Sequence, residues 1–79
     1  MAGAKEENLA FFQGELPRLL ADPILRHKFV VVHDREVKAA FDTFDAALRH
    51  AVARFPTDEF IVQHVIDDRE VINFIRAAG

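Results

Sequence analysis

The chain has 79 residues, no cysteine, a formal net charge of −3 and an apolar fraction of 51%, with eight phenylalanines. The absence of cysteine excludes disulfides and zinc–thiolate sites, and the mild negative charge argues against a protein that binds a nucleic-acid backbone. No apolar run approaches the roughly 20 residues that span a bilayer, and the N-terminus lacks the apolar core of a signal peptide. We therefore expect a cytoplasmic protein whose partners include neither nucleic acid nor a membrane.

A chain of this length is enough for one domain, which we expect to span residues 5–79 after a disordered N-terminus at residues 1–4. A domain of this size buries only about 60% of its unfolded surface, so its core is small. Natural proteins in this range add disulfides, a metal or a partner chain. Without cysteine, a partner chain is the expected supplement.

The first predicted element is a helix over residues 5–21. Its apolar residues recur at helical spacing, at Leu9, Phe12, Leu16, Leu19 and Leu20. Gly14 and Pro17 interrupt this pattern, which predicts a kinked helix or two short pieces. Asp22-Pro23 ends it.

A β-hairpin follows. Residues 27–33 are rich in β-branched side chains and predict a strand, and residues 36–41 predict its return. The intervening Asp34-Arg35 lacks the glycine that a tight two-residue turn favours, which leaves a slightly longer loop open.

The most regular pattern predicts a helix over residues 44–55. Either Asp42 or Thr43 can accept a hydrogen bond from its first turn, and Asp45 suits the positive end of the helix dipole. Pro56 ends the helix, because the residue before proline disfavours helical angles.

A second hairpin closes the chain, with strands predicted over residues 60–66 and 71–75 around the turn Asp67-Asp68-Arg69-Glu70. The predicted fold class is therefore α+β, in the order α-β-β-α-β-β. We expect one small single-layer, antiparallel or mixed, four-stranded sheet with both helices on one face.

The last predicted strand is more apolar than an exposed sheet edge normally is. Phe11 and Phe12 cannot share one helix stripe, so one of them is free to join an exposed apolar patch. The predicted partner interface comprises Phe11, Val71, Ile72, Phe74 and Ile75.

Four histidines raise the question of a metal. His33 and His64 fall in predicted strands and would share a site with Asp34 or Asp67 only if those strands were neighbours in a suitable register. No pair has a recognised ligand spacing, which favours a half-buried histidine at a strand end and an exposed one elsewhere over a metal site. We predict no metal and no cofactor.

Catalytic patterns are similarly sparse. Serine and cysteine are absent, and Thr43 and Thr57 occupy cap or turn positions. The aspartates at positions 34, 67 and 68 are typical turn residues, and the glycines at 3, 14 and 79 form no phosphate-binding loop. We predict a protein that is not an enzyme.

Two resemblances add to this interpretation. Lys28-Phe29-Val30-Val31-Val32-His33-Asp34, Phe41-Asp42-Thr43-Phe44-Asp45-Ala46-Ala47-Leu48 and Phe55-Pro56 resemble a family of short prokaryotic proteins known only as a domain of unknown function. That resemblance implies a small α/β domain without established catalytic residues, although Arg35 stands where members commonly have glycine. The helix start Asp42-Thr43 with Ala46-Ala47-Leu48 is also similar to HicB-type antitoxins, which implies an inhibitor of a toxin.

The function predicted from the sequence is that of a non-catalytic protein–protein interaction module. It would be a small homo-oligomer or an accessory subunit of a larger prokaryotic assembly, bound to another copy or to an unrelated chain. The alternatives are a metal- or small-ligand-binding protein that uses His33 and His64, and an antitoxin-like inhibitor.

Overall fold

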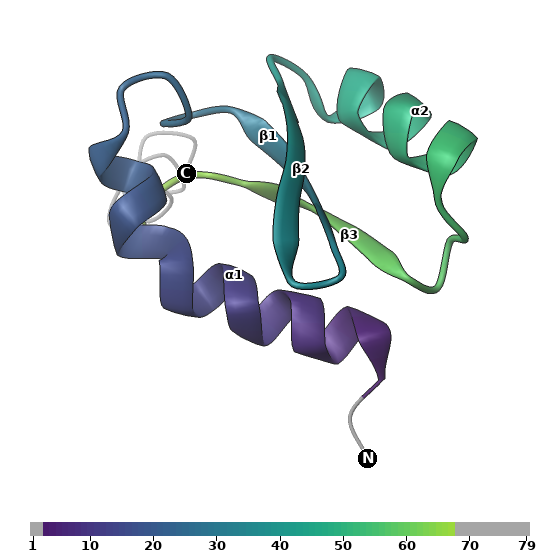
Figure 1. The fold of residues 1–79 in the computed structure, drawn as a ribbon. Coiled ribbons are helices and arrows are strands. Elements are labelled where there is room, and N and C mark those ends of the chain that lie inside the picture. Colours follow the sequence, from purple (N-terminus) through teal and green to yellow (C-terminus); the bar gives the residue numbers. More distant parts are fainter. Residues whose placement is uncertain (1–2, 68–79) are drawn as a thin grey trace, which may run out of the picture.

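The computed structural model describes residues 3–67 (Figure 1). The elements are α1 (Ala4–Ala21), β1 (Phe29–His33), β2 (Glu36–Phe41), α2 (Phe44–Arg54) and β3 (Phe60–His64). The predicted α+β class is confirmed, and these elements follow the predicted order as far as β3. The fourth predicted strand, at residues 71–75, lies outside the described residues.

The sheet has the order β2-β1-β3, and β1 pairs antiparallel with both neighbours. The register shifts between Val31 and Val32, because β2 contains a β-bulge whose extra residue is Lys38. The connection through α2 carries the chain from one sheet edge to the other, past the central strand.

The central strand β1 is buried on both faces, because Val30, Val31 and Val32 are all fully buried. Successive side chains of a strand point to opposite faces, so such a run needs cover on both sides. Val30 and Val32 pack against α1, whereas Val31 packs against α2. The two helices therefore cover opposite faces, and the prediction of both helices on one face is wrong. Their buried contributions are Phe12 and Leu19 from α1 and Ala47 and Ala51 from α2.

Helix α1 is continuous across Pro17. Proline removes one backbone donor and crowds the preceding turn, and Figure 1 shows the helix axis changing direction toward its C-terminal end. The helix begins at Ala4 with Gly3 as its N-cap, although the sequence predicted disorder to residue 4. Glu6 and Glu7 in the first turn favour this start, since they complement the helix dipole.

The N-cap of helix α2 is Thr43. The Thr43 side chain accepts a hydrogen bond from the Ala46 backbone N–H at 3.1 Å, while Asp42 forms an ion pair with Lys28. Phe55 is the C-cap, as Pro56 predicts. The capping prediction is confirmed, with Thr43 in that role.

The buried side chain of Asn8 joins three parts of the fold. Its Nδ2 donates to the Glu59 carbonyl at 2.9 Å, and its Oδ1 accepts from the Arg35 backbone N–H at 2.8 Å. Only 1% of Asn8 is exposed. This amide ties α1 both to the β1–β2 turn and to the segment before β3, so we call it the Asn8 latch.

The turn that the latch holds is the two-residue Asp34-Arg35 turn, and not the longer loop that the sequence left open. His33 pairs with Glu36, and Asp34 and Arg35 both have positive φ, at 53° and 55°. This is the two-residue type I′ turn, formed here without glycine. Because the left-handed conformation costs a non-glycine residue about 1–2 kcal/mol, the latch to Arg35 helps to offset local strain.

Replacing Asn8 with alanine removes both latch bonds and leaves the Glu59 carbonyl and the Arg35 N–H without the hydrogen bonds that Asn8 makes. We expect Asn8→Ala to lower the free energy of unfolding by about 2–3 kcal/mol, measured by urea denaturation. Gln13→Ala, at an exposed amide on the same helix, is the matched control and should change stability by less than about 0.5 kcal/mol. Equal effects of the two substitutions would contradict the latch.

Replacing Arg35 with glycine keeps the N–H that the latch binds and relieves the left-handed strain. We expect Arg35→Gly to raise the free energy of unfolding by about 0.5–1 kcal/mol, after allowance for the greater entropy of the unfolded chain. Arg49→Gly, inside α2, should instead lower it by about 1 kcal/mol. A destabilising Arg35→Gly would show that the arginine side chain is needed.

Candidate functional site

The two histidines considered as metal ligands lie at opposite ends of one ladder. His64 pairs with Phe29, and His33 pairs with Phe60. They share the sheet face that α2 covers, but four residues of β1 separate them, which corresponds to roughly 13 Å. Two ligands of one metal ion lie within a few ångströms of each other, so the structure does not bring His33 and His64 together.

Each of these imidazoles instead stacks on a phenylalanine. The ring centroids of His33 and Phe55 are 4.1 Å apart, and those of His64 and Phe29 are 4.2 Å apart. His64 also donates from Nε2 to the His27 carbonyl at 3.2 Å. Both side chains are half-buried at the end of a strand, whereas the sequence predicted this of one histidine and an exposed position for the other.

The polar residues weighed as catalytic candidates are also accounted for in this part of the chain. The Thr43 hydroxyl caps α2, and Asp42 pairs with Lys28. Asp34 lies exposed in the left-handed turn. Across residues 3–67, no group of three or more His, Asp or Glu side chains is arranged to hold a metal ion.

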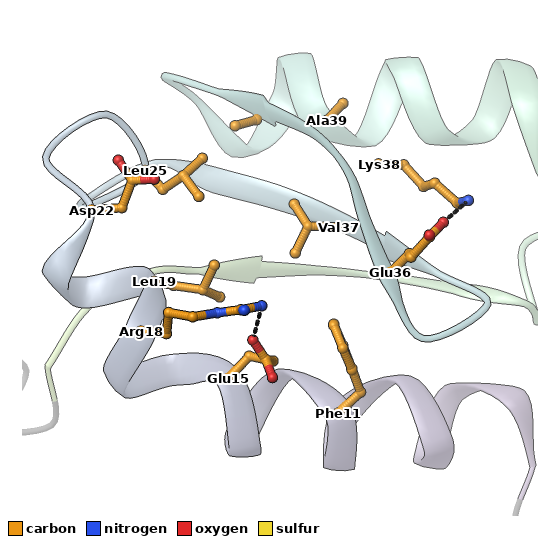
Figure 2. Close-up of a pocket in the computed structure, with 11 residues that line it drawn as sticks. Phe11, Glu15, Arg18, Leu19, Asp22, Leu25, Glu36, Val37, Lys38 and Ala39 are labelled. Atoms are coloured by element: carbon orange, nitrogen blue, oxygen red, sulfur yellow. Dashed lines mark hydrogen bonds and ion pairs between the residues drawn. The ribbon is translucent and has the colours of Figure 1, made fainter.

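An apolar groove of about 570 Å³ lies between α1 and β2, and we call it the α1/β2 groove. Figure 2 shows Phe11 and Leu19 on its helix side, Leu25 on the connector and Val37 on its strand side. Leu19 is buried and forms the floor, whereas Phe11 and Val37 are half-buried. The small residues Ala39 and Ala40 complete the strand side.

Five charged side chains from the described residues line this groove, and four of them form two ion pairs, whereas the fifth, Asp22, accepts a hydrogen bond from the Ile24 N–H at 2.9 Å. Glu15 and Arg18 form an ion pair on α1, and Glu36 and Lys38 form another on β2 (Figure 2). The hydrogen bond and charge of Lys38 hold the pKa of the Glu36 carboxyl below its ordinary value. Because these charges neutralise one another, the groove presents an apolar interior with no net charge from these pairs.

The strand side of the groove is a sheet edge. Among residues 3–67, β2 pairs only with β1, so its outer backbone groups have no strand partner there. The bulge at Lys38 and the Glu36–Lys38 pair are features that protect edges from unselective pairing. They affect the first half of β2 and leave Ala39 to Phe41 as regular edge.

Among the described residues, only one of the predicted partner interface lines the groove. Phe11 lines the α1/β2 groove, while Val71, Ile72, Phe74 and Ile75 lie outside the described residues. Three lining residues of the groove, Val37, Ala39 and Ala40, were not among the predicted interface residues. The sequence does show a short strand with two adjacent small residues before its last residue. Nothing in the sequence, however, indicates that this strand lies at the edge of the sheet.

Comparison with protein-family models, with curated proteins and with solved structures found no match to this chain. The two resemblances drawn from the sequence therefore stay predictions. Neither α1 nor α2, the helices within residues 3–67, combines the length and apolar character needed to cross a bilayer.

Replacing both separated histidines tests the metal hypothesis directly. We expect His33→Gln/His64→Gln to give the same heats as the wild-type chain when titrated with Zn²⁺, because the two side chains cannot share an ion. The unfolding free energy should fall by about 0.5–1.5 kcal/mol for each lost ring pair. His50→Gln serves as control, and a loss of zinc binding confined to the double variant would contradict this interpretation.

Proposed function

We propose that the protein is a non-catalytic protein–protein interaction module whose docking surface is the α1/β2 groove. The observation that carries the proposal is an apolar groove beside a sheet edge that has no strand partner among the described residues. Backbone groups at such an edge can pair with an added strand, and side-chain pockets beside it then select the sequence.

The regular half of the β2 edge supports recognition of an extended segment. The small side chains of Ala39 and Ala40 allow a partner backbone to approach closely, whereas the Lys38 bulge interrupts pairing beyond them. A segment added here would direct alternate side chains into the groove, toward Phe11 and Leu19.

The chemistry of the groove also defines the partner. Its interior is apolar and its two flanking ion pairs neutralise each other, so a charge placed among the apolar side chains would lose hydration without gaining a counter-ion from these pairs. Among the described residues that line the groove, Asp22 is the one charged residue outside the pairs, and its Oδ1 already accepts a hydrogen bond from the Ile24 N–H. The expected partner is therefore a short, β-branched or aromatic segment of another chain, uncharged over the residues that enter the groove. This role fits an accessory subunit of a cytoplasmic, prokaryotic assembly, and an antitoxin-like inhibitor would be a special case in which the partner is a toxin.

We also propose, separately from the docking surface, the fourth strand and the complete order α-β-β-α-β-β. A strand at residues 71–75 would make this four-stranded sheet, with one edge left for a partner. The surface that would receive this strand lies along β3, at the edge of the described sheet opposite β2, and is separate from the groove.

Two exposed alanines provide a matched test of the docking surface. Ala40 lines the groove on β2, whereas Ala53 lies on α2 away from it. We expect Ala40→Arg to reduce capture of the partner by about tenfold or more, because a long charged side chain fills the groove and must be desolvated. Ala53→Arg should leave capture unchanged.

The measurement is an affinity purification from the native host with wild-type, Ala40→Arg and Ala53→Arg bait, quantified by mass spectrometry. Equal melting temperatures would establish that both variants fold. One protein retained at constant ratio by wild type and Ala53→Arg but lost with Ala40→Arg would support the proposal. Equal retention by all three baits, or no specific protein with any, would overturn it.

A further inference from the structure

A second apolar surface runs along β3, on the opposite edge of the sheet. Four large apolar side chains are strongly exposed among residues 3–67, and three of them, Leu9, Phe44 and Val52, border β3. The exposed fractions of Phe44 and Val52 are 50% and 53%, although both belong to the apolar stripe of α2. An exposed apolar patch of this kind is a candidate surface for another segment or chain to cover.

The exposed side chains line two hollows along β3, one mainly toward α1 and one mainly toward α2, and the second also reaches Lys5 of α1. The hollow toward α1 has about 520 Å³ and that toward α2 about 410 Å³. Between them runs β3, which pairs only with β1 within the described part of the chain. We call this surface the β3 flank, and its exposed or half-buried apolar lining is Leu9, Leu16 and Ile66 toward α1 and Phe44, Leu48 and Val52 toward α2.

A hollow on each side of a sheet edge requires a strand with apolar side chains on both faces. Residues 71–75, Val-Ile-Asn-Phe-Ile, have that pattern. In an extended segment Val71 and Ile75 point to one face while Ile72 and Phe74 point to the other. This differs from the groove at β2, which lies on one face of the sheet only.

The end of the described chain lies close to this flank. The Val65 carbonyl accepts from the His27 N–H at 2.8 Å, and the Val65 N–H donates to the Lys28 carbonyl at 2.9 Å, which fixes the end of β3 beside the connector. The polar residues 67–70 are long enough for a hairpin loop back to β3. A strand added to the outer edge of β2 would instead lie two strand spacings, roughly 10 Å, beyond β1 on the side away from β3.

We propose that the β3 flank is the docking site of the same chain's residues 71–75, which add to β3 as an antiparallel strand. Their apolar side chains enter the hollows on both faces and cover Leu9, Phe44 and Val52. This inference concerns a different surface from the proposed partner groove and does not rest on it.

The absence of cysteine allows a direct test in the full-length chain. With Gln63→Cys on β3 and Asn73→Cys in the segment, a short bis-maleimide should produce a cross-linked monomer. Lys38→Cys with Asn73→Cys, which probes the β2 edge, is the matched control and should react several-fold less. Peptide mapping identifies the linked residues, and labelling with a monofunctional maleimide verifies that each cysteine is accessible.

Three outcomes would overturn the proposal. Equal or greater cross-linking to Lys38→Cys would move the segment to the β2 edge. Covalent dimers, formed when singly substituted chains are mixed, would assign the segment to a second copy. Accessible cysteines that cross-link in neither pair would exclude docking at either edge.

Hydrogen exchange of the unmodified chain gives an independent measurement. If residues 71–75 pair with β3, successive amides of β3 are all protected, because they bond alternately to β1 and to the added strand. Alternate amides of β2 should exchange faster in the isolated protein and provide the internal comparison. Rapid exchange at every second β3 amide would overturn the proposal, and neither result alters the test of the groove.

Discussion

The structure depends on the burial of β1 from both sides. Val30, Val31 and Val32 are fully buried, and consecutive strand residues can be buried only if both faces of the sheet are covered. This requirement places α1 on one face and α2 on the other. It also makes β1 the central strand, so that β2 and β3 become the edges from which both candidate binding surfaces are built.

The Asn8 latch sets how α1 lies over its face. One amide side chain bonds to the β1–β2 turn and to the segment before β3, and thereby ties the N-terminal half of the helix to both edges of the sheet. Phe11 and Phe12 follow within one turn, with Phe12 directed into the core and Phe11 into the α1/β2 groove. Helix α1 contacts β1 and β3 more than β2, which leaves β2 partly uncovered beside the groove, and the latch contributes to the position of that helix.

Local features of this fold can be predicted from the sequence, whereas the arrangement of its layers was predicted wrongly. The Thr43 cap, the Pro56 stop and the bounds of β2 depend on neighbouring residues, and they agree with the prediction. The uninterrupted Val30-Val31-Val32 run did carry the signal for a strand buried on both faces, but it was interpreted only as β propensity. Asn8 was missed because a buried amide has no periodic signature, and its partners are 27 and 51 residues away. The groove depends on which strand occupies the sheet edge, a tertiary property that no single segment encodes.

The two edges of this small sheet differ in a way that suggests separate roles. The β2 edge combines a bulge, a lysine and an ion pair with a groove on one face, which restricts pairing to a short regular stretch. The β3 edge has apolar hollows on both faces and no comparable protection within the described residues. An edge of the second kind promotes aggregation unless it is permanently covered, and a segment of the same chain is always present to cover it. An edge of the first kind tolerates exposure, and so it is the one suited to a partner that binds and leaves.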